Sequence, residues 1–220
     1  MTLRPPAGFT VPDRLAAFDV MRDLAEDELR IEGVSVTGIA APGLRVRHWS
    51  LAESAVRGAV LAGAELPEVW LREVAVDGAD LANAKLRAAT LQRVRLVDTR
   101  LTGATLADSS LRDVVVKDSQ ADFAAFGTAK LERVLFSGCN LREASFGEAR
   151  LREVRFEHCD LSRASFHRAS LQRVEFVACT LTGVAMGDLR GAAMPWSDIV
   201  ASAGELALGL GITAIEEETG

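Results

Sequence analysis

The stretch Leu71-Arg72-Glu73-Val74 decides the fold, because its pattern returns with a period of 20. Its later copies are Leu91-Gln92-Arg93-Val94, Leu111-Arg112-Asp113-Val114, Leu131-Glu132-Arg133-Val134, Leu151-Arg152-Glu153-Val154 and Leu171-Gln172-Arg173-Val174. A stricter period of five runs through them. Every fifth residue over 51–186 gives 28 positions, which hold 17 Leu, 6 Phe, 3 Val, one Met and one Ala. The position two residues earlier holds only Ala, Val, Cys, Ser or Thr over 59–184.

These two periods predict an all-β solenoid. A period of five fits neither the 3.6-residue turn of a helix nor the two-residue alternation of a strand. It fits a chain that turns a corner every five residues and points one small and one large side chain inward. Because the pattern also repeats at 20, each coil has four sides, and equivalent residues stack about 4.8 Å apart. We expect a β-helix of about 7–8 coils.

The pattern also divides the chain into three parts. It continues backwards, less regularly, to residue 29, and no inserted loop interrupts it over 51–186. We therefore expect an N-terminal segment at 1–28, a β-helix at 29–190, and a C-terminal helix with an acidic tail at 191–220.

Both ends of a solenoid need caps, because each end exposes unpaired backbone and core. Thr10 and Pro12 predict a helix start, and the apolar spacing that follows predicts a capping helix at about 12–26. After Pro195, Ser197 is the expected N-cap of a second helix that ends near Gly209. Its apolar stripe predicts either a cap on the last coil or a two-fold dimer contact. The residues of this possible dimer contact are Trp196, Ile199, Val200, Ala203, Leu206 and Leu210.

Composition narrows the function classes. Aromatic residues make up only 5% of the chain, with no Tyr, as a narrow interior requires. The sequence has no apolar run of about 20 residues and no signal-peptide core, so we expect no membrane span. Three cysteines do not form a disulfide framework, so we expect a location in the reducing cytoplasm. The formal net charge of −6 argues against direct nucleic-acid binding.

Catalytic and cofactor motifs are missing from the sequence. It has no glycine-rich phosphate loop, nucleophile elbow or HExxH motif, so we predict that the protein is not an enzyme and binds no cofactor. Cys139, Cys159 and Cys179 are spaced by the longer period and stack in one inward column. A straight column does not converge as the tetrahedral geometry of zinc requires, so we interpret the thiols as structural and predict no metal site.

The repeats resemble those of the pentapeptide repeat proteins, whose pattern is A(D/N)LXX. Good copies are Ala79-Asp80-Leu81-Ala82-Asn83, Cys139-Asn140-Leu141-Arg142-Glu143 and Cys159-Asp160-Leu161-Ser162-Arg163. The resemblance covers about 160 of the 220 residues and implies a right-handed quadrilateral β-helix. Ala121 departs from the pattern as a small central residue. We expect a local distortion there, with Phe123 covering the gap.

The resemblance also implies a partner. The best-understood members mimic DNA, bind DNA gyrase, and inhibit it or confer resistance to quinolones or topoisomerase toxins. Gyrase-binding members dimerise through C-terminal elements. Quinolone-resistance members use inserted loops for protection, so without such loops inhibition is the expected activity here. The residues that would face such a partner lie on the most acidic face: Glu65, Glu68, Asp108, Glu148 and Asp188. Residues 51–186 hold 18 basic and 18 acidic side chains, so the repeat body is neutral. The alternative is a rigid scaffold or interaction module with an unknown protein partner.

Overall fold

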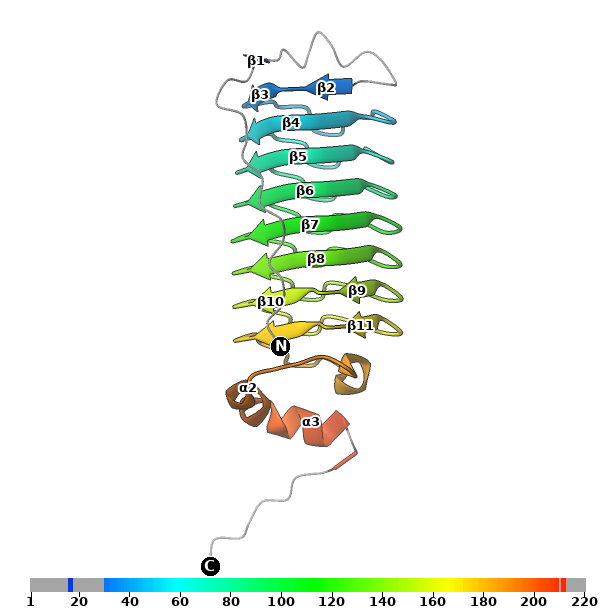
Figure 1. Cartoon of the computed structure of the whole chain (residues 1–220), viewed down its shortest axis with the longest axis vertical. Helices are drawn as coiled ribbons and strands as arrows, with labels where there is room; N and C mark the ends of the chain where they lie inside the picture. Colours follow the sequence, from blue (N-terminus) through cyan, green and yellow to red (C-terminus); the bar gives the residue numbers. More distant parts are fainter. Residues whose placement is uncertain (1–15, 18–29, 210, 213–220) are drawn as a thin grey trace, which may run out of the picture.

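The protein is a straight parallel β-solenoid. The computed structural model describes residues 16–17, 30–209 and 211–212, and Figure 1 shows them as a stack of coils with two short helices at the C-terminal end. In chain order the strands are β1 (Ala16–Ala17), β2 (Arg30–Glu32), β3 (Val34–Thr37), β4 (Ser50–Arg57), β5 (Trp70–Asp77), β6 (Thr90–Val97), β7 (Ser110–Lys117), β8 (Lys130–Ser137), β9 (Arg150–Arg152), β10 (Arg155–Glu157), β11 (Ser170–Gln172) and β12 (Glu175–Val177).

Every step from β3 to β12 has the register that the longer sequence period requires. Ser35 pairs with Ala55, and the same ladder continues in parallel to Glu175. Seven such steps join the strands in the order β3, β4, β5, β6, β7, β8, β10 and β12, which confirms the predicted solenoid.

Each coil has four sides, which we call walls 1 to 4. Wall 1 carries the inward residues 51 to 171, wall 2 carries 56 to 176, wall 3 carries 61 to 181 and wall 4 carries 66 to 186, each in steps of 20. The eight-residue strands β4 to β8 span walls 1 and 2. Walls 3 and 4 pair through single bridges such as Val60 with Asp80 and Glu65 with Lys85.

Hydrogen-bonded tight turns make the corners that follow walls 3 and 4. On wall 3 the carbonyl of Leu61 accepts a hydrogen bond from the Ala64 N–H at 3.0 Å, and Gly63 between them has φ +67°. This is a type II turn, which needs a left-handed residue at its third position. Among the described residues, 22 corners hold a non-glycine residue at φ of 49–62°. Each such residue costs about 1–2 kcal/mol, so the hydrogen bonds between coils must hold the corners in place.

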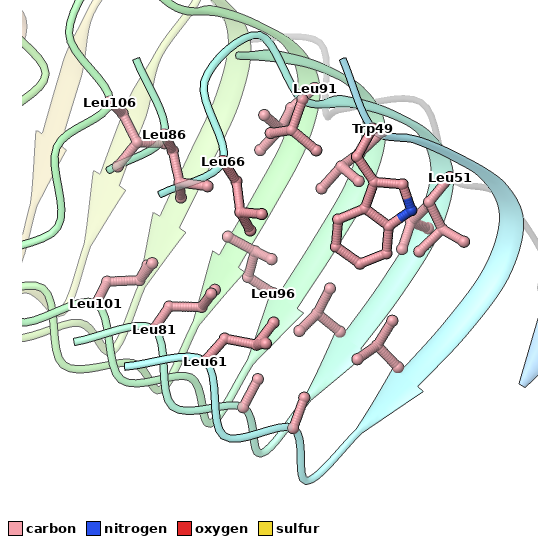
Figure 2. A pocket seen from close by; sticks show the side chains of 17 residues that line it. Trp49, Leu51, Leu61, Leu66, Leu81, Leu86, Leu91, Leu96, Leu101 and Leu106 are labelled. Carbon is pink, nitrogen blue, oxygen red and sulfur yellow. The ribbon is translucent and has the colours of Figure 1, made fainter. Parts of the chain in front are cut away.

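The core is one continuous apolar column that changes composition along its length. In the last coils six Phe side chains fill it. Phe126 and Phe146 stack with their centroids 4.9 Å apart, and Phe136 meets Phe146 edge-on at 6.1 Å. Earlier coils carry Leu or Val at these positions. They enclose a cavity of about 70 Å³ between Trp49 and Leu106, lined only by apolar side chains (Figure 2).

The two ends differ from the predicted caps. Ala16–Ala17 pair in parallel with β3 as β1, so the helix predicted at 12–26 is wrong at these two residues, and the rest of it lies outside the described residues. At the other end, the chain forms a 3-10 helix η1 (Met186–Leu189), then α2 (Trp196–Ala201) and α3 (Ala203–Gly209). Pro195 rather than Ser197 precedes α2, and no side chain caps it. The single predicted helix is therefore two.

The coil at Ala121 is undistorted. The Ala121 side chain is fully buried, and its N–H donates to the Asn140 carbonyl at 2.7 Å in the regular ladder. Phe123 occupies the next corner at φ 58° and is 56% exposed, so it does not cover the core. The predicted distortion is wrong because the hydrogen bonds between coils depend on the backbone and tolerate a small central side chain.

Candidate functional site

The residues of the predicted acidic face lie along wall 4 and its corner, except Asp188 in η1, and two of them are paired with basic side chains. Glu65 lies between Lys85, at 2.7 Å, and Arg45, at 3.5 Å, in the coils on either side. Asp108 pairs with Arg87 at 2.7 Å. Wall 4 therefore alternates in charge from coil to coil over its N-terminal half. The regular stacking of coils places side chains of opposite charge directly above one another, as cross-strand pairing favours.

The remaining acidic residues of wall 4 are less compensated. Glu68 contacts the His48 ring at 3.2 Å, whereas Glu148 and Asp188 have no ion pair among the described residues. Glu68, Asp108 and Glu148 occupy one corner column at intervals of two coils, which is about 9.6 Å, whereas Asp188 lies in η1 after the last regular corner. The structure thus gives three separated negative corners rather than a continuous negative stripe.

Two of these carboxyl groups have a lowered pKa. The hydrogen bond from Lys85, together with nearby Arg45, lowers the pKa of Glu65. For Asp108 the Thr128 hydroxyl is the main cause of a lowered pKa, and Arg87 adds to it. Both groups stay ionised at neutral pH, and both are held in structural contacts.

Corner residues between walls 1 and 2 form an ion-pair ladder that the sequence did not single out. Glu73 pairs with Arg93, and Glu153 pairs with Arg173. Between these pairs, the Arg133 guanidinium donates hydrogen bonds of 2.7 and 2.9 Å to the two carboxylate oxygens of Asp113, which is almost fully buried. The alternating acid and Arg at residues 73, 93, 113, 133, 153 and 173 are the signal that could have revealed this ladder.

A shallow groove of about 560 Å³ crosses wall 1 near its N-terminal end. Small side chains form its floor: Ser50 and Ala52 of β4 lie between larger residues of β2 and β5. Trp70 stands at one side, 36% exposed, with the Arg72 guanidinium carbon 5.9 Å from its ring centroid. The full lining is Arg30, Ile31, Glu32, His48, Ser50, Ala52, Glu68, Trp70 and Arg72.

The C-terminal helices carry an exposed apolar patch. Trp196 is 76% exposed, and Val200, one helical turn later, is also exposed. Ile199 is half-buried, Ala203 is exposed, and the side chains of Leu206 and Leu210 lie outside the described residues. Leu208 and Ile212 are exposed as well, although the stripe did not include them. The break between α2 and α3 turns α3 to a direction that a single helix would not have.

The geometry offers no catalytic cluster in the described part of the chain. No three His, Cys, Asp or Glu side chains there converge on a point where a metal ion could bind. The enclosed cavity has no polar side chain that could act on a substrate. No helix of the described residues has the length and hydropathy to cross a membrane.

Comparisons with known proteins agree with this architecture. A family model described as a pentapeptide repeat region matches residues 89–157, and a model of eight pentapeptide repeats matches residues 149–186. A search of curated proteins finds no significant match.

Three solved structures are similar. HetL from the cyanobacterium Nostoc, a pentapeptide repeat protein involved in heterocyst differentiation regulation, is 24% identical with a TM-score of 0.35, over 76% of this chain and 90% of HetL. A trypsin-treated variant of QnrB1, a plasmid-mediated fluoroquinolone resistance protein, is 19% identical with a TM-score of 0.44, over 84% of this chain and 99% of QnrB1. A pentapeptide repeat protein of the Arabidopsis thaliana thylakoid lumen is 20% identical with a TM-score of 0.41, over 43% of this chain and 66% of that protein.

The two family models together match residues 89–186. The strand pairing at intervals of 20 residues continues on the N-terminal side of that range. The chain therefore carries pentapeptide repeats over residues 89–186.

Proposed function

We propose that the protein is a rigid, non-catalytic rod that binds another protein through the groove at Trp70. The observation that carries this proposal is the pair of the exposed Trp70 and the half-buried Arg72 beside a floor of small side chains. Tryptophan and arginine are the residues most enriched at the energetic centres of protein interfaces. A groove one coil wide accepts a side chain or a short segment of a partner.

Rigidity strengthens this surface. Arg72 is fixed by Glu53 at 2.9 Å and Glu32 at 3.1 Å, and the wall beneath is hydrogen-bonded from coil to coil. A partner that binds here therefore loses little free energy to ordering of the rod. The same regularity leaves no inserted loop between the paired coils from β3 to β12.

A photo-crosslinking amino acid at Ser50, on the groove floor, tests the proposal in cells of the native host. Ser110 is the matched control, because it occupies the same column of wall 1 three coils away. We expect a partner crosslinked from Ser50 but not from Ser110, and loss of that crosslink in Trp70→Ala. Equal crosslinking from both positions, or a crosslink that survives Trp70→Ala, would refute the groove as the contact.

A type II topoisomerase such as DNA gyrase is a second candidate partner. The observation in its favour is the corner column of Glu68, Asp108 and Glu148, followed by Asp188 in η1, which could compete with DNA for a basic surface. The cytoplasmic location expected from the cysteine usage remains part of this proposal. The ion pairs along wall 4 reduce the field of this column, so inhibition should be weak and sensitive to salt.

A gyrase supercoiling assay, with and without a quinolone, tests this candidate. We expect micromolar protein to inhibit, and Glu148→Gln with Asp188→Asn to relieve the inhibition. Asp77→Asn with Asp98→Asn is the control, because it removes the same charge from the wall 2 side. The absence of both inhibition and protection, or equal relief by the control, would exclude the column as a DNA mimic.

We also propose that a second copy of the chain binds the C-terminal patch. Trp196 and Val200 present apolar surface that a two-fold interface would bury. Light scattering after gel filtration should show a dimer that Trp196→Glu converts to a monomer. Trp70→Glu, at the exposed tryptophan of wall 1, is the control and should remain dimeric. A monomeric wild-type protein, or a dimer that survives Trp196→Glu, would contradict this contact.

A further inference from the structure

Three free thiols form one straight inward column at the C-terminal end of the rod. Cys139, Cys159 and Cys179 occupy equivalent positions before wall 3, and Ser119 precedes them in the same column. Cys139 and Cys159 are buried, and Cys179 is partly exposed. Access to the column is therefore greatest at Cys179, in the last coil.

The thiols point in the same direction. The Cys139 Sγ lies 3.3 Å from the carbonyl of Val116 and 3.5 Å from that of Ser137. The Cys159 Sγ makes the same two contacts one coil later, at 3.5 and 3.3 Å. Because these contacts repeat, neighbouring sulfur atoms are separated by the rise of one coil. Stacked Phe rings in the same coils give that rise as 4.9 to 5.0 Å.

A straight column at this spacing is wrong for zinc and right for a linear ion. Zinc needs ligands that converge tetrahedrally, and the described residues offer no such group. Thiolates also prefer soft closed-shell ions, some of which bind only two ligands in a line. Metal–thiolate bonds are about 2.3 Å long in zinc sites, so two such bonds in a line span about 4.6 Å. The span is close to the separation of neighbouring sulfurs in the column.

We propose that adjacent thiols of this column bind one soft, linear-coordinating ion, with mercury(II) as the reference ligand. Two thiols bind one Hg²⁺ and release two protons, which gives a neutral bis-thiolate unit. Neutrality matters because an uncompensated charge in the apolar interior would be costly. Cys159 must take part in each site, since it is the neighbour of both other thiols.

Mercury stoichiometry in the full-length protein tests the proposal. The protein is incubated with HgCl₂ and a molar excess of glutathione, passed through gel filtration, and analysed by native mass spectrometry. Glutathione removes mercury from single thiols, whereas a preorganised pair retains it through its high effective concentration. Wild type, with three thiols, should retain one ion per chain.

Matched variants along the column make the outcome specific. Cys159→Ser leaves the outer thiols two coils apart and should retain no ion. Cys139→Ser keeps the pair of Cys159 and Cys179 and should retain one. Ser119→Cys creates a fourth thiol at a buried position and should retain two. Circular dichroism confirms that each variant keeps the β-helix.

Three results would overturn the site. Wild type that retains no mercury lacks an accessible pair. Cys159→Ser that retains as much as wild type shows that the thiols bind singly. Zinc that displaces mercury at equal concentration points to converging ligands instead of a line.

Discussion

Replacing Phe146 by Leu should lower the free energy of unfolding more than replacing Phe126 by Leu, because Phe146 loses about twice as much aromatic pairing energy. Phe146 stacks on Phe126 at 4.9 Å and on Phe166 at 5.0 Å, and it meets Phe136 and Phe156 edge-on at 6.1 and 5.6 Å. Phe126 has one stacked and one edge-on partner. Both side chains are buried, so the lost hydrophobic burial is similar.

The magnitudes follow from the number of ring pairs. One aromatic pair contributes about 0.5–1.5 kcal/mol beyond area burial, so four pairs contribute about 2–6 kcal/mol and two pairs about 1–3 kcal/mol. Urea unfolding followed by far-UV circular dichroism measures the free energy of unfolding of each variant. Equal losses for the two variants would refute the reasoning, because burial alone would then explain both.

The reverse substitution, Leu106→Phe, extends the stack by one ring. It adds a pair with Phe126, worth about 0.5–1.5 kcal/mol. It also fills part of the 70 Å³ cavity, which at about 24 cal/mol per Å³ contributes at most about 1.7 kcal/mol. We expect a gain in unfolding free energy of about 1–3 kcal/mol, and a loss would show that the Leu-lined coils cannot accept a ring.

Three further substitutions test the corners and the surface. Ala88→Gly relaxes a left-handed corner at φ 54° and should raise the unfolding free energy by about 0.5–1 kcal/mol; a lower melting temperature would contradict this. Asp113→Asn removes the bidentate partner of Arg133 and should cost about 2–4 kcal/mol in urea unfolding, whereas an unchanged midpoint would show that the pair contributes nothing. Burial raises the pKa of Asp160, but the hydrogen bonds led by that from Ser162 outweigh it and leave the pKa lowered. Because the folded pKa is below the unfolded one, this carboxylate stabilises the fold above pH about 4 and loses that effect as the pH falls further. Asp160→Asn should therefore flatten the acid limb of the stability profile, and an unchanged limb would contradict the assignment.

The candidate surfaces were less predictable than the fold. The period of 20 in the sequence sets the position of each side chain around the coil, with Glu65 on wall 4 and Glu68 and Asp108 at its corner. It did not show that Lys85 and Arg87 neutralise two of them, since the reach and direction of long side chains depend on neighbouring coils. The groove at Trp70 could not be predicted from the sequence for the same reason, because it exists only where Ser50 and Ala52 of the neighbouring coil have small side chains.

By itself the sequence determined the period, the number of sides and the residues that point inward. These features follow from a strict local rule. The backbone turns at every pentad and is hydrogen-bonded to the equivalent position of the next coil, so each large side chain has one position inside the coil. Only the tertiary structure decided what happens between coils. It aligned Arg133 with the buried Asp113, left an apolar cavity where Leu replaces Phe, and set three thiols in a line. Such features depend on distances across coils, which no local pattern contains.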